Sequence, residues 1–199
     1  MNVHIIPYVN QPNWLNIPYI ELANRQWKVV EGISARAQIC YTNDAIFLKL
    51  SANEYPIVHT HTGPLGAPYE DSCLEFFFCP AENDNRYFNF EFNPNTCLLL
   101  GIGTGRGDRT RLLVDDQQAI FSPVPEISED TWCITYKIPF DFIRRFFPSF
   151  SPTTGYKMRA NFYKCGHLTP QPHFLTWNFC NSPTPNFHSP DNFGILIFD

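Results

Sequence analysis

The pattern of hydrophobic and polar positions predicts two adjacent strands joined by a polar turn. The first strand, Ser72–Cys79, is apolar except for Glu75, and the turn Pro80–Arg86 leads into the second strand, Tyr87–Asn93. In the second strand three phenylalanines alternate strictly with polar or tyrosine side chains. This period of two is typical of a strand with one buried face and one solvated face. A single carboxylate in an apolar strand must be paired or must face a site, because an uncompensated buried charge is costly.

The rest of the chain is predicted to consist mostly of short strands. Phe140–Phe147 is amphipathic and lies between two prolines, so we predict one helix of about two turns there. Loops are predicted at Asn53–Glu70 and Cys165–Pro190, and a loop with a short strand at Trp14–Trp27. Further strands are predicted at Val3–Val9, Ala35–Thr42, Ala45–Ala52, Thr96–Thr104, Thr131–Pro139, Tyr156–Lys164 and Asn192–Phe198. Many short strands separated by turns indicate one all-β domain over residues 1–199, an antiparallel β-sandwich of about ten strands.

Composition agrees with a β-rich chain and argues against several partners. The sequence has 19 Phe, 9 Tyr, 4 Trp and 18 Pro, and 44% of its residues are hydrophobic. Aromatic residues favour strands, and so hydrophobic a chain is not disordered. A net charge of −5 argues against nucleic acid or an anionic membrane as the main partner. No apolar run is long enough to span a bilayer.

The cysteines and the N-terminus bear on the compartment. Seven cysteines form no CxxC pair, which argues against structural zinc, and we expect them to be buried free thiols. Free thiols favour a reducing compartment. Met1–Asn10 has neither the basic nor the apolar region of a signal peptide. We therefore expect a cytoplasmic protein if Met1 is the native start, and a periplasmic or extracellular one if a leader was removed.

Polar side chains on three of the predicted strands could share one surface. Carboxylates, amides and a guanidinium on neighbouring strands can form paired hydrogen bonds to vicinal hydroxyl groups. Tyr69 and Trp177, each in a loop beside a polar strand, are candidate rings for stacking on a sugar. Alternatively, the face is simply solvated, or is buried under loops with its groups paired internally. The polar residues concerned are Glu75, Asn89, Glu91, Asn93, Arg159, Asn161 and Tyr163.

The glycine-rich segment Gly101–Gly107 does not fit a dinucleotide site. Its glycines depart from the G-x-G-x-x-G spacing, and no helix is predicted after it. A hairpin turn that requires positive φ explains the glycines better. Arg106, Arg109 and Arg111 could bind an anionic group such as a uronate, sulfate or phosphate, or could form local ion pairs in a solvated turn.

Several blocks occur together and in a fixed order between residues 69 and 194. They are YEDSCLEFF at Tyr69–Phe77, RYFNFEFN at Arg86–Asn93, GIGTGRGDR at Gly101–Arg109, MRANFY at Met158–Tyr163, Trp177, and NFHSPDNFG at Asn186–Gly194. Through these blocks the chain resembles the family 9-like carbohydrate-binding modules, relatives of the DOMON-type, jelly-roll-like β-sandwich.

This resemblance implies a non-catalytic sugar-binding module. Such modules are usually associated with glycoside hydrolases in the utilisation of polysaccharides. In the family, two aromatic rings clamp a terminal sugar, Glu, Arg and Asn side chains hold its hydroxyl groups, and calcium often stabilises the fold. By position, the rings fall on Tyr69, where Trp is usual, and on Trp177. The polar roles fall on Glu75, Arg159 and Asn161, with Asn89 and Glu91 as neighbours, and Arg106 is a further binding candidate.

Metal sites and other functions remain as alternatives. Asp71 beside Glu75, with Asp44 and Asp84-Asn85 elsewhere, could supply oxygen ligands to a structural calcium ion, and His59 and His61 could form a metal pair without a firm third ligand. Glu75 and Glu91 could act in glycoside hydrolysis, which needs two carboxylates roughly 5–10 Å apart. A third possibility is a DOMON-like sensor or protein-interaction domain.

Overall fold

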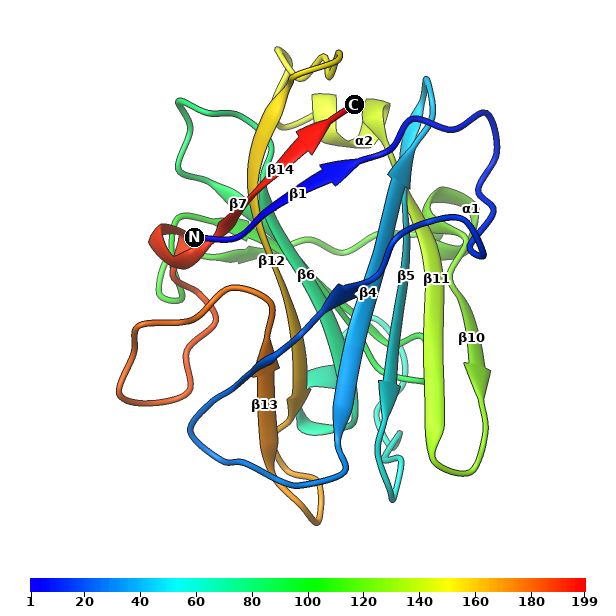
Figure 1. Ribbon diagram of the computed structural model, residues 1–199, viewed down its shortest axis with the longest axis vertical. Helices are drawn as coiled ribbons and strands as arrows, with labels where there is room; N and C mark the ends of the chain where they lie inside the picture. Colours follow the sequence, from blue (N-terminus) through cyan, green and yellow to red (C-terminus); the bar gives the residue numbers. More distant parts are fainter.

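Two β-sheets packed face to face make up the molecule (Figure 1). The computed structural model describes every residue from 1 to 199. Neighbouring strands are antiparallel, except that the first and last strands of the chain run parallel at one edge of the larger sheet. The chain is therefore a β-sandwich, as the hydrophobic pattern predicts.

The two sheets contain fourteen strands. The larger sheet has the order β1 (Val3–Ile6), β14 (Gly194–Phe198), β12 (Lys157–Gly166), β6 (Cys73–Cys79), β7 (Tyr87–Phe92), β8 (Leu98–Gly103) and β9 (Thr110–Arg111); β13 (His173–Thr176) pairs with β12, and β3 (Asn24–Arg25) pairs with β13. The smaller sheet has the order β10 (Val124–Ile127), β11 (Thr131–Pro139), β5 (Ala45–Asn53), β4 (Ser34–Tyr41) and β2 (Ile20–Glu21). The helices are α1 (Gln117–Phe121) and α2 (Phe140–Arg144), with 3₁₀ turns η1 (Pro68–Glu70) and η2 (Pro190–Asn192).

The main hydrophobic core lies between the sheets. Because side chains alternate along each strand, β6 and β7 direct every second residue inward, including Phe76 and Phe90. Both are completely buried in a core that also contains aliphatic residues of β5 such as Leu48. Burying one such side chain stabilises the fold by roughly 1.5–3 kcal/mol, so this set of phenylalanines holds the two sheets together.

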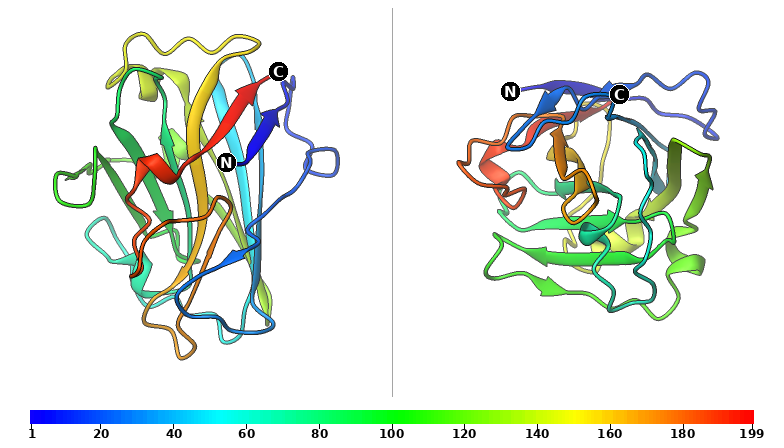
Figure 2. Two further views of the ribbon diagram at one scale, coloured as in Figure 1. Left: turned by 60° about the vertical axis from the view of Figure 1, so that its left-hand side comes forward. Right: turned by 90° about the horizontal axis from the view of Figure 1, so that it is seen from below.

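A second, smaller core covers the opposite face of the larger sheet. We call it the outer core; it contains Phe77, Tyr163, Phe187 and Phe193, together with Cys73, Cys79, Tyr87, Cys165, Phe174 and Cys180. The chain that follows β13, orange to red in Figure 2, supplies Phe187, which stacks on Tyr163 with ring centroids 4.1 Å apart. All seven cysteines of the chain are free and buried, as expected. The outer core means that the larger sheet is buried on both faces.

Most predicted strands are present, and several details are corrected. β11 has the bounds expected from the sequence, and α2 is shorter than predicted. A second helix, α1, and the short strands β9, β10 and β13 were not predicted, and β13 lies in the segment Cys165–Pro190 that was expected to be a loop. The expected solvated face of Tyr87–Asn93 is wrong, because all of these residues are buried by the outer core and its neighbouring loops. No helix is long and apolar enough to cross a bilayer.

Candidate functional site

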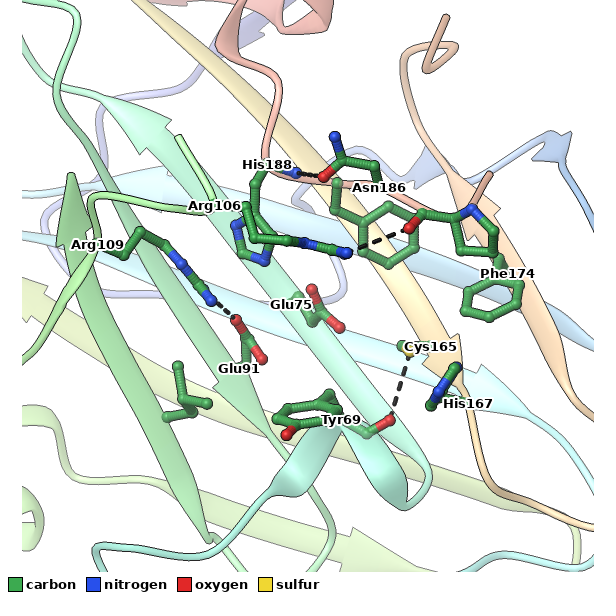
Figure 3. A pocket seen from close by; sticks show the side chains of 13 residues that line it. Tyr69, Glu75, Glu91, Arg106, Arg109, Cys165, His167, Phe174, Asn186 and His188 are labelled. Atoms are coloured by element: carbon green, nitrogen blue, oxygen red, sulfur yellow. Dashed lines mark hydrogen bonds and ion pairs between the residues drawn. The ribbon is translucent and has the colours of Figure 1, made fainter. Parts of the chain in front are cut away.

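A cavity of about 430 Å³ opens above the outer face of the larger sheet, beside the outer core. Its floor comes from β6 and β7, through Glu75 and Glu91, and one side is formed by Tyr69 of η1 (Figure 3). The turn between β8 and β9 contributes Arg106 and Arg109. The opposite wall comes from β13 and the chain after it, through Phe174, Asn186, Phe187 and His188. Segments that are far apart in the sequence therefore meet at this cavity.

Two buried carboxyl groups form the floor of the cavity. Glu75 and Glu91 are directly opposite one another in the register of β6 and β7, and they are only 2% and 3% exposed. Burial, followed by repulsion from Glu91, raises the pKa of Glu75 well above its usual range. Burial raises the pKa of Glu91 to about 7 against the attraction of Arg109. The raised pKa favours the protonated form of Glu75, which can both donate and accept a hydrogen bond.

Glu91 is held in place by two neighbours. Its Oε1 accepts a hydrogen bond of 2.9 Å from Nδ2 of Asn89, and Nη1 of Arg109 lies 3.5 Å from the same oxygen. Asn89 follows from the period of two, because it lies on the same face of β7 as Glu91. It is completely buried beneath the cavity. Asn89 therefore positions Glu91 and does not itself line the cavity.

Glycines on β8 allow this close packing. A Cβ atom on Gly101 would lie 2.5 Å from Oδ1 of Asn89, and one on Gly103 would lie 2.7 Å from the Cα of Arg109. Neither glycine has positive φ. The prediction that a turn with positive φ requires these glycines is therefore wrong; they are needed because other groups approach too closely for a side chain.

The two arginines of the β8–β9 turn have different partners. Nη2 of Arg106 donates to the carbonyl oxygen of Pro185 at 3.2 Å, across the mouth of the cavity. Arg109 is paired with Glu91, and its Nε is buried without a hydrogen-bond partner. The turn itself is closed by Asp108, whose carboxylate accepts from the backbone N–H of Thr104. The cavity thus has guanidinium donors at its side and carboxyl groups on its floor.

The expected aromatic ring at Trp177 lies elsewhere. Tyr69 is 38% exposed and lines the cavity, but Trp177 is only 6% exposed and packs in the main core against Phe162. The backbone N–H of Trp177 donates to Phe162, and its indole fills the space next to Gly194. Trp177 therefore has a packing role, and its placement in the binding site is corrected. Phe174 and Phe187 are the aromatic residues that line the wall of the cavity.

Arg159 and Asn161 share the outer face of the sheet with Glu75 but do not reach the cavity. Arg159 is near the far end of β12, where Nη2 donates to Asn85 at 3.2 Å. Asn161 is completely buried, donates to the carbonyl of Asn178 and accepts from its N–H. It fixes the chain after β13 to the sheet. The structure thus brings together Tyr69, Glu75, Glu91 and Arg106, and it separates Arg159, Asn161 and Trp177 from them.

His188 is a wall residue whose role the sequence did not predict. Its ring lines the cavity and its Nδ1 lies 2.9 Å from the hydroxyl of Tyr87. The block Asn186–Gly194 marked this segment, but it has no periodicity from which the direction of a side chain can be predicted. Arg109 was noted only as a candidate for anion binding. Phe174 carried no signal in the sequence, and Asn186 and Phe187 were marked only as members of that block.

The residues proposed for calcium do not fit such an ion. The carboxylate oxygens of Asp71 already accept hydrogen bonds from Thr60, the N–H of His61 and Asn93. Nε2 of His61 lies 3.0 Å from Oε2 of Glu70, and the carboxylate of Asp84 is paired with the guanidinium of Arg86. No three His, Cys, Asp or Glu side chains are grouped in a way that could hold a metal ion. The oxygens that calcium would need are thus committed to the protein.

The chain is similar to known carbohydrate-binding proteins in sequence and in fold. A protein of Bacteroides uniformis, assigned provisionally to carbohydrate binding, is 27% identical over 99% of both chains, with a TM-score of 0.85. A carbohydrate-binding module of family 9 from Caldicellulosiruptor kristjanssonii, solved with glucose and with cellotriose, is 12% identical with a TM-score of 0.71. Those two alignments cover 100% and 99% of this chain and 96% and 93% of the others. Among curated proteins, none matches the sequence.

The sequence model for carbohydrate-binding family 9 matches residues 9–198. The matched range includes every strand of the two sheets except β1, the outer core and every residue of the cavity. The chain therefore belongs to carbohydrate-binding family 9.

Proposed function

We propose that the cavity over β6 and β7 binds a mono- or oligosaccharide without chemical turnover. The observation that carries this proposal is the buried pair Glu75 and Glu91, which faces the cavity beside the guanidinium groups of Arg106 and Arg109 (Figure 3). Two carboxyl groups whose raised pKa values favour a bound proton, together with guanidinium donors, match the alternating donors and acceptors of vicinal hydroxyl groups.

The shape and lining of the cavity support a sugar as ligand. Its volume of about 430 Å³ is within the roughly 300–1,000 Å³ usual for small-molecule sites. Tyr69 offers an exposed ring at the side, and Phe174 and Phe187 provide apolar surface on the opposite wall. A pyranose ring has apolar C–H faces and a polar rim of hydroxyl groups, so such a lining can contact both.

The proposed role is recognition during the utilisation of glycans. The solved family member from Caldicellulosiruptor kristjanssonii binds glucose and cellotriose, which makes these sugars the first probes for this chain. The residues that would contact the sugar are Tyr69, Glu75, Glu91, Arg106 and Arg109. Calcium has no part in this proposal, because the acidic side chains concerned are already paired.

Isothermal titration calorimetry with a panel of mono- and oligosaccharides tests the proposal. Glu75→Gln keeps the shape of the floor but removes the acid, and it should weaken binding about 10- to 100-fold through loss of a strong hydrogen bond. Glu129→Gln, at an exposed position far from the cavity, is the matched control and should bind as the wild type does. Equal binding by both variants would contradict the site. Hydrolysis of an aryl glycoside that Glu75→Gln abolishes would replace binding with catalysis.

A further inference from the structure

The imidazole ring of His188 makes two contacts at the wall of the cavity, and the backbone of His188 makes a third. It stacks on Phe77, with ring centroids 4.9 Å apart and planes inclined by 29°. Its Nδ1 lies 2.9 Å from the hydroxyl oxygen of Tyr87, and its backbone N–H donates to Oδ1 of Asn186 at 3.1 Å. These contacts fix the position and the plane of the ring without any ligand.

The contact with Tyr87 also fixes which ring nitrogen carries the hydrogen. Tyr87 is completely buried between Phe77 and Phe193, and its hydroxyl has no hydrogen-bond partner other than Nδ1 of His188. Burial raises the pKa of the Tyr87 phenol, which therefore keeps its hydrogen and donates it. A nitrogen that accepts a hydrogen bond cannot be protonated, so the hydrogen of the neutral imidazole is on Nε2.

The ring remains neutral over the working pH range. Burial, and then the nearby charges of Arg109 and Arg106, lower the pKa of His188 to about 2. Its Nε2 has no hydrogen-bond partner in the protein and is not a buried atom. His188 therefore presents one N–H donor, in one orientation, to whatever occupies the cavity.

We propose that His188 is a specificity-determining residue that donates from Nε2 to an oxygen of the bound sugar, and that Tyr87 is the positioning residue that sets this tautomer. The proposal rests on the proposed function. A neutral imidazole fixed in this way cannot accept a hydrogen bond from Nε2, so the atom it contacts must offer a lone pair. A ring oxygen, a glycosidic oxygen or an outward-turned hydroxyl meets this condition. Together with the guanidinium groups of Arg106 and Arg109, the Nε2–H of His188 places hydrogen-bond donors on one side of the cavity. These donors face the carboxyl groups on its floor.

Substitutions at position 188 separate the donor from the bulk of the ring. In His188→Gln the amide nitrogen can take the place of Nε2, whereas His188→Phe keeps a flat ring without a donor. Titrated with D-glucose and with cellotriose, His188→Phe should lose about tenfold in affinity, the value of one hydrogen bond, and His188→Gln should retain most of it. Tyr87→Phe should weaken binding as well, although Tyr87 is not exposed to the cavity, because the wrong tautomer becomes populated.

A long-range ¹H–¹⁵N NMR spectrum of the sugar-free protein reads the tautomer directly. We expect Nδ1 of His188 to resonate as an unprotonated nitrogen and Nε2 as a protonated one, and we expect Tyr87→Phe to give a mixture. In the His188→Gln background, Tyr87→Phe should no longer change the affinity, because no tautomer remains to be set. A merely structural role of Tyr87 would lower affinity equally in both backgrounds.

The outcomes distinguish this inference from the proposed function. If wild-type protein binds the probes and His188→Phe binds equally well, the inference is overturned and the sugar site stands. A protonated Nδ1 in the wild type overturns the role of Tyr87. If the wild type binds no sugar of the panel, the proposed function fails and the sugar-binding role of His188 fails with it, whatever tautomer the NMR spectrum shows.

Discussion

In this protein, the effect of a buried charge on the stability of the fold depends on the groups that are paired with it. Glu54 and Lys164 lie 2.9 Å apart and are almost completely inaccessible, and Trp132 and Ser72 donate to the same carboxylate. Burial alone would raise the pKa of Glu54, but the charge and hydrogen bond of Lys164, with the bonds from Trp132 and Ser72, lower it. Glu54 therefore favours the folded state as a carboxylate, and only while its partners remain.

Replacing Lys164 with methionine should strongly destabilise the fold. The variant leaves Glu54 buried without a counter-charge, which should lower the free energy of unfolding by about 3–5 kcal/mol at pH 7. Urea denaturation measures this, and a second change, Glu54→Gln, should restore much of the loss. Because the folded pKa of Glu54 is lowered, its contribution is present above the ordinary glutamate pKa and is lost as pH falls. A loss below about 1 kcal/mol in Lys164→Met would show that the pair is not needed.

The stability of the fold should also respond to the protonation of Glu91, with the opposite sign. Its pKa is raised from 4.5 to about 7, so the folded state binds the proton more tightly than the unfolded state does. The stabilisation of the folded state by this bound proton is complete below pH 4.5 and is lost as pH rises to about 7. Glu91→Gln should flatten the dependence of unfolding free energy on pH between these values. An unchanged slope in this variant, relative to the control Glu129→Gln, would argue against the raised pKa.

At the scale of strands, periodicity predicted which residues share a face but not what covers that face. The alternation of Tyr87–Phe92 correctly places Asn89 and Glu91 opposite the phenylalanines of the same strand. Their burial depends on residues 177–193, which are far away in the sequence and have no regular period. The ring of Trp177 is directed into the main core by its position just after β13. No local sequence pattern indicates this direction. Glu75, Glu91 and Tyr69 could thus be found from sequence, whereas His188 and Phe187 could not.

The close contact between β8 and β9 should depend on Gly103. In Gly103→Ala the new Cβ would lie 2.7 Å from the Cα of Arg109, so β9 must shift, at a cost of about 1–3 kcal/mol in unfolding free energy. Arg109 would move with β9, and sugar affinity should fall. Gly107→Ala is the matched control, because no atom lies within 4 Å of its Cβ position and its φ is not positive. Chemical denaturation and calorimetric titration of both variants compare their stability and their sugar affinity. Equal stability and equal affinity in the two variants would contradict the role of Gly103.

Substitutions of two aromatic residues from the sequence blocks should affect the stability of the fold and sugar binding separately. Trp177→Ala removes a core side chain and should lower the free energy of unfolding by about 3–5 kcal/mol. Tyr69→Ala removes a half-exposed ring at the cavity, and should change stability little while sugar binding weakens. Urea denaturation and titration calorimetry on both variants test this. Normal stability of Trp177→Ala with complete loss of binding would instead return Trp177 to the binding site.

For the molecule as a whole, the cavity is a consequence of having two cores. The main core holds the sheets together, and the outer core fixes the chain after β13 over the larger sheet (Figure 2). The cavity opens where that chain, η1 and the β8–β9 turn meet above β6 and β7. The sandwich architecture could be predicted from strand patterning, but the place of this opening depends on long-range packing that no single segment encodes.

Binding at this place should stabilise the entire fold. A ligand that binds only the folded state at 100 times its Kd raises the free energy of unfolding by about 2.7 kcal/mol. Thermal unfolding of the wild type with a saturating sugar should therefore occur at a higher temperature than without it, and Glu75→Gln should show a smaller increase at the same sugar concentration. An identical increase in both proteins would place the sugar away from Glu75.

A sugar titration followed by ¹H–¹⁵N NMR of the assigned wild-type protein shows where on the molecule the sugar binds. If the cavity over Glu75 and Glu91 binds the sugar, the largest shift changes will be at Tyr69, Glu91 and His188, with little change at Trp177 or Arg159. The cavity is not the binding site if the changes occur instead on the outer face of the smaller sheet, near Arg36 and Asn53, or if no sugar in a broad panel shifts any resonance of the cavity.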